Sequence, residues 1–370
     1  MTPLEEEIRA LIAAEGPMPV SRYMALCLGH PRYGYYITRD PLGAKGDFTT
    51  APEISQMFGE LLGLWAVAAW QQMGSPDAFH LVELGPGRGT LMADALRAAR
   101  LVPAFGAAAQ VHLVETSPAL RERQAQALAG IEPSWHDRLE EVPPGPAIVI
   151  ANEFFDALPI SQFVRGEGGW HERRVGLGEG GELVLGLDPR PSPMGEALAR
   201  HVPPPHSHGA VLEHLESGVA GALGARLAAQ GGAALVIDYG YAASGLGDTL
   251  QALRAHRFAD PLEAPGEADL TAHVDFAALA RTVMAAGAAA YGPLTQGDFL
   301  VRLGIVQRAE RLQQNTNASQ RKAITAALNR LAGTGKDEMG ALFKVLCLCD
   351  PLFGTPPGFG ADEAFAEPDA

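Results

Sequence analysis

The stretch His80-Leu-Val-Glu-Leu-Gly-Pro-Gly-Arg-Gly89 decides the fold class of this chain. Its first half is typical of a short apolar strand, and the glycines that follow open a helix expected over 90–99. Gly85 permits a tight turn, Gly87 lets a ligand approach the backbone, and Gly89 allows the helix to pack closely on the strand. A strand, a glycine-rich turn and a helix in this order indicate a cofactor-binding α/β domain.

The spacing of the glycines points to one kind of cofactor. A dinucleotide fingerprint reads GxGxxG, whereas here the triplet is GxGxG with Thr90 in the last place. An acidic residue, Glu83, stands two positions before the first glycine. This variant suits a ligand that has an amino acid tail and no pyrophosphate, and S-adenosylmethionine is such a ligand. An ordinary glycine-rich turn is the alternative, but the position between strand and helix favours the cofactor.

The alternation of strand and helix continues along the chain. Further strands are expected at 111–115, 134–136, 147–151, 233–238, 288–294 and 343–349. Helices are expected between them, for example at 117–128, 214–230 and 275–286. This pattern predicts an α/β fold with a doubly wound, Rossmann-like parallel sheet. Most of 239–271 reads as loop.

We divide the chain into four consecutive segments. Residues 1–79 form an N-terminal helical cap with a lid loop, in which one long helix is expected over 54–73. The core spans 80–240, with a β-hairpin excursion at 160–205. A substrate-side insertion with the final core strands occupies 241–350, and 351–370 is a flexible tail. The sheet is therefore expected to carry inserted helical and hairpin subdomains.

Composition limits the function classes. The 370 residues are 47% hydrophobic and carry a formal net charge of −15, which excludes a wholly disordered chain and disfavours nucleic acid as a partner. The acidic N-terminus lacks a signal peptide pattern and no apolar run is long enough to span a bilayer, so a cytoplasmic protein without membrane insertion is expected. Three cysteines and no CxxC pair argue against disulfides and against a metal site.

Two acidic residues follow expected strands and are candidates for cofactor binding. Glu115 ends the second core strand, where an acidic side chain accepts hydrogen bonds from ribose hydroxyls. It also precedes a helix, so a charge at the helix start is the alternative. Asp137 follows the third strand and is a candidate acceptor for the adenine amino group, although an exposed aspartate in a loop is common.

Several longer motifs resemble the MidA family of class I S-adenosylmethionine-dependent methyltransferases. They are Gly46-Asp-Phe-Thr-Thr-Ala-Pro-Glu-Ile-Ser-Gln-Met-Phe-Gly-Glu60, Ala151-Asn-Glu-Phe-Phe-Asp-Ala-Leu-Pro159, Ile237-Asp-Tyr-Gly240, Gly247-Asp-Thr-Leu-Gln251, Ala268-Asp-Leu-Thr-Ala-His-Val-Asp275, Thr295-Gln-Gly-Asp-Phe-Leu300 and Met339-Gly-Ala-Leu-Phe-Lys344. The resemblance covers nearly the whole chain. It implies a class I methyltransferase fold and S-adenosyl-L-methionine as cofactor. It also implies methylation of a protein arginine, on a target such as a respiratory complex I subunit during assembly.

The resemblance also directs attention to the first motif, where Asp47, Thr49 and Thr50 belong to a long loop before the helix. Long ordered loops without secondary structure are often functional lids. The resemblance therefore implies that these three residues help to cover the cofactor.

Catalytic candidates follow the strand at 147–151. A guanidinium stays protonated, and carboxylates on its far nitrogens can localise the charge there, which leaves one nitrogen nucleophilic. Glu153 and Asp156 lie where open α/β sheets bind ligands, and Asn152 can bond amino groups of substrate or cofactor. The alternatives are a helix N-cap for Asp156 and a structural ion pair for Glu153.

Two other function classes remain open at this point. One is an assembly chaperone that binds the cofactor without turnover, because an intact glycine loop shows binding and not catalysis. The other is a small-molecule methyltransferase, in which the cap and the insertion at 241–335 close over a small pocket.

Overall fold

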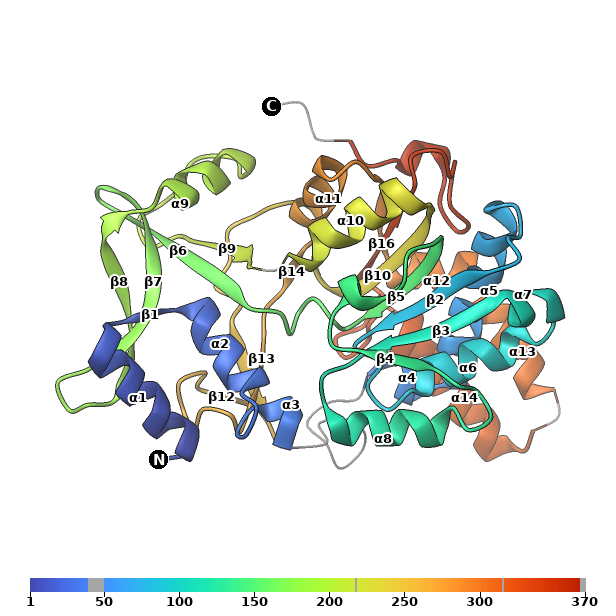
Figure 1. Cartoon of the computed structure of the whole chain (residues 1–370), viewed down its shortest axis with the longest axis horizontal. Coiled ribbons are helices and arrows are strands. Elements are labelled where there is room, and N and C mark those ends of the chain that lie inside the picture. Colours follow the sequence, from blue (N-terminus) through green and yellow to red (C-terminus); the bar gives the residue numbers. More distant parts are fainter. Residues whose placement is uncertain (39–49, 217, 315, 367–370) are drawn as a thin grey trace. The chain divides into compact units, whose positions relative to one another are not determined.

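The computed structural model describes residues 1–38, 50–216, 218–314 and 316–366 (Figure 1). Chain contacts divide the molecule into two compact units, each assembled from separated segments. Unit 1 comprises Met1–Phe48, Phe155–Ser217 and Ala243–Asp275; unit 2 comprises Thr49–Phe154, Gly218–Ala242 and Phe276–Ala370. The four consecutive segments inferred from the sequence stay a prediction.

Unit 2 is built on a sheet whose strands lie in the order β15-β16-β10-β5-β2-β3-β4. Strands β10, β5, β2, β3 and β4 run parallel, whereas β16 is antiparallel to both of its neighbours. The bounds are β2 (Phe79–Leu84), β3 (Ala109–Val114), β4 (Ser134–His136), β5 (Ala147–Asn152), β10 (Gly232–Tyr241), β15 (Ala289–Thr295) and β16 (Phe343–Cys349). The predicted α/β, doubly wound sheet is confirmed.

Helices cover both faces of this sheet. They are α4 (Ala51–Ile54), α5 (Gln56–Gln72), α6 (Thr90–Ala99), α7 (Pro103–Ala108), α8 (Pro118–Ala127), α10 (Val219–Gln230), α11 (Phe276–Ala285), α12 (Gln296–Arg302), α13 (Ile305–Gln313) and α14 (Ala318–Ala332), with the 3-10 helices η1 (Leu139–Glu141) and η3 (Ala361–Glu363). The single helix expected over 54–73 is broken at Ser55. That residue is extended, and its side chain accepts a hydrogen bond from the Met57 N–H, so it caps α5.

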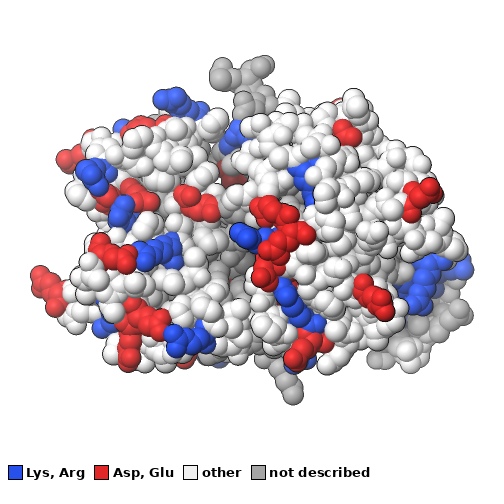
Figure 2. Space-filling model, viewed as in Figure 1, with Lys and Arg blue, Asp and Glu red and all other residues white. Residues whose placement is uncertain are grey.

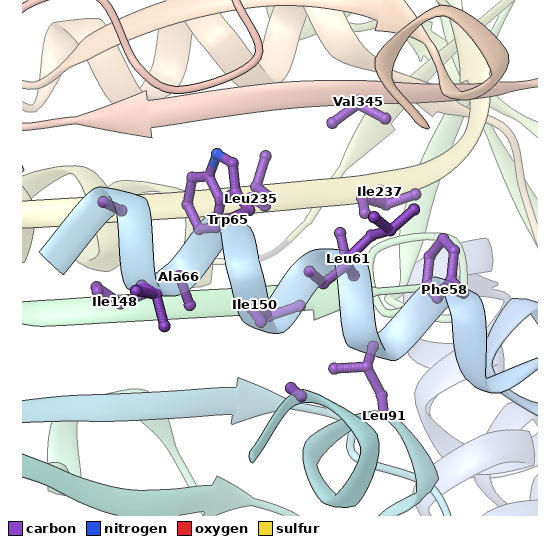
Figure 3. Close-up of a cluster of buried hydrophobic side chains, with 14 of the residues drawn as sticks. Phe58, Leu61, Trp65, Ala66, Leu91, Ile148, Ile150, Leu235, Ile237 and Val345 are labelled. Carbon is purple, nitrogen blue, oxygen red and sulfur yellow. The ribbon is translucent and has the colours of Figure 1, made fainter. Parts of the chain in front are cut away.

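The core of unit 2 lies between α5 and the sheet. Figure 3 shows Leu61 and Trp65 of α5 beside strand residues such as Ile150 and Leu235, and all four are at most 3% exposed. Successive side chains of a strand point to opposite faces of the sheet. Leu348 of β16 is fully buried and points to the face away from α5, where α10 and α11 contact this strand. Burial on both faces explains why the strands read as continuous apolar runs.

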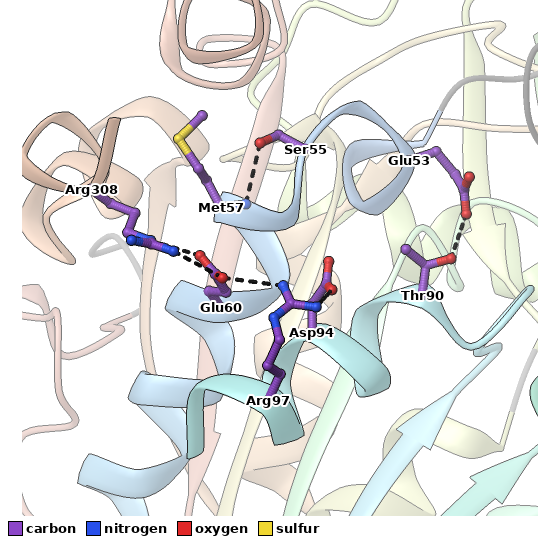
Figure 4. Close-up of polar contacts among 8 residues, drawn as sticks. All are labelled: Glu53, Ser55, Met57, Glu60, Thr90, Asp94, Arg97 and Arg308. Atoms are coloured by element: carbon purple, nitrogen blue, oxygen red, sulfur yellow. Dashed lines mark hydrogen bonds and ion pairs between the residues drawn. The ribbon is translucent and has the colours of Figure 1, made fainter. Parts of the chain in front are cut away.

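A buried carboxylate joins three helices of unit 2 (Figure 4). Glu60 of α5 is 7% exposed and accepts hydrogen bonds from Arg97 of α6 at 3.1 Å and from Arg308 of α13 at 2.7 Å. Arg97 also donates to Asp94 at 2.5 Å. Because the carboxylate is largely removed from water, its paired guanidinium groups are needed to offset the cost of burial.

Unit 1 is a mixed α and β structure. Its larger sheet has the order β1-β7-β6-β9, with β8 also paired to β7, and its smaller sheet has the order β12-β11-β13. The bounds are α1 (Pro3–Glu15), β1 (Met18–Pro19), α2 (Val20–Gly29), α3 (Tyr35–Thr38), β6 (Ile160–Gly166), β7 (Gly169–Leu177), β8 (Leu183–Pro191), α9 (Pro193–Leu198), η2 (Ala199–His201), β9 (Val211–Leu215), β11 (Gln251–Arg254), β12 (Arg257–Ala259), β13 (Asp269–Thr271) and β14 (Val274–Asp275). Strand β1 pairs antiparallel with β7, so that Met18 lies opposite Val175.

One prediction about local structure in the middle of the chain is wrong. The helix expected from His214 starts only at Val219, because Val211–Leu215 pairs with β6 as strand β9. The segment 239–271 is mostly loop as predicted, but it also contains the three short strands of the smaller sheet, including Gln251–Arg254. These strands depend on pairing with other segments, which local propensity does not encode.

A row of three histidines crosses the parallel sheet of unit 2. The Nδ1 of His80 lies 2.9 Å from Nε2 of His112, whose Nδ1 lies 2.9 Å from Nε2 of His136. The other ring nitrogen of His80 contacts the Pro144 carbonyl at 3.2 Å. Burial lowers the pKa of all three rings, that of His112 to about 4. The row is therefore neutral at pH 7, which allows each ring to donate to or accept from the next.

Charged side chains are mixed on the surface seen in Figure 2, where Lys and Arg groups alternate with Asp and Glu groups between large uncharged areas. Among the described residues, several charged side chains are paired, such as Arg302 with Glu363 at 2.6 Å and Arg9 with Glu5 at 2.5 Å. On that face the described residues form no broad basic area.

Candidate functional site

The glycine loop follows β2 as predicted from the sequence. Gly85, Gly87 and Gly89 have φ values of +63°, +53° and +82°, a region that side chains other than glycine rarely adopt. A Cβ on Gly89 would come 3.2 Å from Cα of Gln124, which explains the close packing of helix α6 against its neighbour. The turn therefore has a backbone conformation that favours glycine at all three positions.

Two buried oxygen atoms near this turn have no hydrogen-bond partner among the described residues. They are Oε2 of Glu83, on β2, and Oδ1 of Asn152, at the end of β5. Glu83 lies opposite Ile150, so Asn152, two positions further along β5, is on the same face of the sheet. Buried acceptors of this kind favour a ligand that brings donors. The ammonium group of an amino acid tail fits this requirement.

Glu83 is 3% exposed, and its burial raises the pKa of its carboxyl to about 8. A hydrogen bond from the Met92 backbone opposes the shift without cancelling it. The group is therefore largely protonated at pH 7 in the free protein. A cation placed against it would favour the ionised form.

Glu115 directly follows β3 and is 8% exposed. Its Oε1 accepts a hydrogen bond from the Ser117 N–H at 2.8 Å, at the start of α8, and its Oε2 accepts one from Gln124 at 3.2 Å. Burial raises the pKa of the carboxyl despite these bonds. Both interpretations of this residue stay compatible with the geometry, because the side chain contacts the helix start and lies at the carboxyl end of the sheet.

Asp137 follows β4 as expected, but its side chain is 67% exposed and forms an ion pair with Arg121 at 2.5 Å. Arg121 also donates to the Glu115 carbonyl oxygen. The structure thus places Asp137 on the surface beside the site, engaged by a neighbouring cation. Its contact with adenine stays a prediction.

The predicted catalytic residues divide between the two units. Asn152 and Glu153 belong to unit 2, and Asp156 belongs to unit 1. Glu153 has φ of +51°, which is unusual for a glutamate and typical of residues held in place at functional sites. Its N–H donates to the Ile237 carbonyl at 2.8 Å, and its Oε1 accepts from Ala51 N–H at 3.1 Å and from the Asn152 amide at 3.0 Å.

Within unit 1, Asp156 is 7% exposed and its carbonyl accepts a hydrogen bond from the Ala272 N–H. Its charge and that of Asp269 both act on the Tyr36 hydroxyl, and together with burial they raise the pKa of that group. Tyr36 donates to Asp269 at 2.9 Å. Asp156 therefore belongs to an acidic, buried neighbourhood of its own unit.

The predicted loop residues Asp47 and Thr49 lie outside the described residues. Thr50 is described and is the N-cap position of α4, where its side chain makes no capping hydrogen bond. Glu53, in α4 of the same motif, contacts the residue that follows the glycine loop. The Thr90 hydroxyl donates to it at 2.6 Å (Figure 4).

Sequence reasoning missed two side chains that hold the site together, Gln124 of α8 and Trp135 of β4. Gln124 is fully buried, and Trp135 donates to it at 2.8 Å. The only signal in the sequence was the position of each residue close to a predicted cofactor ligand. A glutamine in a mostly polar helix such as α8 does not reveal its partners in advance.

Comparisons with known proteins agree with this geometry. The family model described as "Putative S-adenosyl-L-methionine-dependent methyltransferase" matches residues 61–294. Two curated relatives are named protein arginine methyltransferase NDUFAF7, mitochondrial. The one from Danio rerio is 38% identical over 92% of this chain and 85% of its own length. The one from Homo sapiens is 38% identical over 94% of this chain and 83% of its own length.

A solved structure is also similar over nearly the whole chain. A protein from Burkholderia thailandensis, crystallised with S-adenosyl-homocysteine, has a TM-score of 0.85 and 29% sequence identity, and the match covers 98% of this chain and 95% of that protein. The class I methyltransferase fold implied by the resemblance is confirmed.

The relatives correct one expectation. They are named as mitochondrial proteins, which contradicts the cytoplasmic location inferred from the sequence. The cytoplasmic location was inferred from the lack of a targeting pattern in the sequence. The folded structure does not depend on such a pattern. Among the described residues, no helix combines the length and apolar character needed to cross a bilayer.

Proposed function

This chain belongs to the family of S-adenosyl-L-methionine-dependent methyltransferases, and from this premise we propose that it methylates an arginine side chain of a protein. The observation that carries the proposal is the 38% identity, over more than nine-tenths of the chain, to proteins named as protein arginine methyltransferases. We further propose that the substrate is a subunit of respiratory complex I, as the resemblance in the motifs implies.

The cofactor supplies an electrophilic methyl group. We propose that the glycine loop and Glu83 hold its amino acid tail, that Glu115 accepts from its ribose, and that Asp137 and residues 47, 49 and 50 contact its remaining parts. Asn152 is a candidate donor or acceptor for the same tail. This assignment is supported by the left-handed backbone of the glycine turn, including Gly87, and by the two buried oxygens that lack a partner among the described residues.

Methyl transfer to a guanidinium requires a nitrogen lone pair that points at the methyl carbon. We propose that Glu153 and Asp156 act on the guanidinium of the acceptor and draw its positive charge away from the attacking nitrogen. The proton on that nitrogen is then lost after or during transfer. The fixed backbone and Oε1 hydrogen bonds of Glu153 support a preorganised carboxylate at the end of β5.

The decisive experiment incubates the protein with methyl-labelled cofactor and a lysate, and identifies the labelled species by mass. Label on an arginine of a protein, lost when that arginine is replaced by lysine, supports the proposal. Label on a metabolite instead would make the chain a small-molecule methyltransferase. Cofactor binding by calorimetry without any transfer would make it a non-catalytic assembly chaperone.

A matched control separates enzymatic from background labelling. The Gly87→Val variant is expected to remain folded and to lose the cofactor, so label that persists with this variant does not come from the chain. Mass analysis of peptides from a labelled respiratory subunit then tests the finer part of the proposal. Label on an arginine of a protein unrelated to complex I would support arginine methylation but would overturn the proposed role in complex I assembly.

A further inference from the structure

The side chain of Gln124 connects three parts of the cofactor site of unit 2. Its Nε2 donates to the Gly87 carbonyl at 2.7 Å and to Oε2 of Glu115 at 3.2 Å. Its Oε1 accepts a hydrogen bond from the Trp135 indole N–H at 2.8 Å. Gln124 is fully buried, so all of these bonds form away from water. One amide thus links the glycine loop, the acidic residue after β3, and β4.

We propose that Gln124 is a positioning residue that fixes the glycine loop and the Glu115 carboxylate relative to each other, so that one cofactor molecule can bind both. The inference rests on the proposed cofactor site and is independent of the methyl acceptor. Neither Gln124 nor Trp135 contacts the cofactor in this proposal. They act through Gly87 and Glu115.

Only an amide satisfies the three partners at once. The two acceptors, Gly87 O and Glu115 Oε2, need two donors on one atom, while the indole needs an acceptor on the other. A neutral glutamine side chain provides two N–H donors and one carbonyl. A glutamate offers no donor when ionised, and a methionine of similar size offers none in any state. The indole also fixes the orientation of the amide, because it can only donate.

The geometry explains why a positioning group is needed here. Gly87 has φ of +53° and lies in a turn of three left-handed glycines, which have little intrinsic conformational preference. Glu115 is buried, and a carboxylate in such a place requires hydrogen bonds to remain ionised. Holding both groups before the ligand arrives reduces the entropy lost on binding.

The test measures binding of S-adenosyl-homocysteine by calorimetry to the full chain and to Gln124→Met, which keeps the volume and removes all three bonds. We expect affinity to fall about ten-fold or more, as for loss of hydrogen bonds that include a charged partner. Affinity within two-fold of the parent in a folded variant would overturn the proposal. If the parent itself fails to bind, the proposed cofactor site fails instead.

A second variant gives a readout that a purely structural role would not move. In Gln124→Glu, an ionised carboxylate would face Glu115 and the Gly87 carbonyl, and protonation would restore one donor. The ratio of the variant's Kd to the parent's is therefore expected to shrink as the pH is lowered from about 8 to about 6. A ratio that does not change with pH would contradict the proposed hydrogen bonds.

Controls come from the same helix and from the third partner. Gln126→Glu makes the same chemical change at an exposed position of α8, and it should leave both the affinity and its pH dependence at the parent's values. Trp135→Phe removes the indole donor together with part of a ring that packs against the core of unit 2, and it should weaken binding several-fold. If both Gln124 variants fail to fold, Trp135→Phe decides: parent-like affinity in that variant would sink the proposal.

Discussion

Oε1 of Glu153 accepts a hydrogen bond from the backbone N–H of Ala51 at 3.1 Å, across 102 positions of the chain. The bond joins the residue after β5 to the first turn of α4, which is part of the first family motif. Because Glu153 also has a positive φ, both its backbone and its side chain are held in unusual and fixed positions. A glutamate held in this way can act on a bound substrate without first being ordered.

Replacing either proposed catalytic carboxylate by its amide should strongly lower methyl transfer. We expect Glu153→Gln and Asp156→Asn to keep cofactor affinity within a few-fold, because the loss concerns charge in the transition state. Single-turnover methylation at saturating cofactor measures the effect. Glu132→Gln, at an exposed position, is the control. Transfer at the parent rate in both variants would remove the carboxylates from the mechanism.

Substitution of the central glycine should abolish cofactor binding. Gly87→Val places a branched side chain at the proposed position of the cofactor tail and forces a left-handed φ on valine. Calorimetric titration with S-adenosyl-homocysteine measures the loss, and circular dichroism checks the fold. In Gly106→Val a new Cβ meets no atom within 4 Å, so parent-like binding is expected. Normal affinity in folded Gly87→Val would refute the glycine-loop assignment.

Loss of the Glu115 side chain should weaken the cofactor by roughly 1–3 kcal/mol, the usual cost of hydrogen bonds to a charged group. The matched control is Glu122→Ala, which removes an exposed carboxylate from the same helix region and should leave affinity unchanged. If Glu115→Ala binds as tightly as the parent, Glu115 serves only the start of α8.

Cofactor binding should release a proton from Glu83. Burial holds its pKa near 8, so the free protein carries the proton at pH 7, and the incoming ammonium favours the ionised form. Affinity is then expected to rise with pH up to about 8 and to level off above that value. Calorimetry in buffers of different ionisation enthalpy counts the protons. Glu83→Gln should show no release, and equal release by parent and variant would assign the proton elsewhere.

The histidine row should make the stability of unit 2 depend on pH, with lower stability in acid. Folding lowers the pKa of His112 from 6.5 to about 4, so the unfolded chain binds more protons between these values. Stability is therefore expected to fall as the pH falls from about 6.5 to about 4, measured as the melting temperature. His112→Gln should flatten this dependence, while the exposed His201→Gln should not. An unchanged slope in His112→Gln would show that other groups control the acid response.

The strand, glycine turn and helix at the end of β2 were predictable from the sequence because they are encoded locally. The run from His80 to Gly89 contains the strand, the turn and the start of the helix within ten neighbouring positions. Glu83 and Glu115 were proposed as cofactor residues for the same reason, since Glu83 is the last residue but one of β2 and Glu115 directly follows β3. Their roles stay a prediction.

The features that were missed depend on contacts between distant segments. Strand β9 forms because Val211–Leu215 pairs with β6, with Val211 opposite Val164, and this pairing removes His214 and Leu215 from the helix expected over 214–230. The three partners of Gln124 come from a loop, a strand end and another strand, so nothing in the helix sequence distinguishes it from the exposed Gln126. The ion pair of Asp137 is likewise set by the position of Arg121.

The pairing of β1 with β7 has a consequence for biosynthesis. The carbonyl of Pro17, next to β1, accepts a hydrogen bond from Arg174 of β7, 157 positions later. At a translation rate of about 5–20 residues per second, β7 is synthesised on the order of ten seconds after the N-terminal helices. Their apolar residues Leu4, Ile8 and Tyr23, all buried in the finished protein, lack the β7 part of their cluster during that interval. The nascent chain is thus expected to need protection by a chaperone at the ribosome, and slowing of synthesis before β7 should increase aggregation.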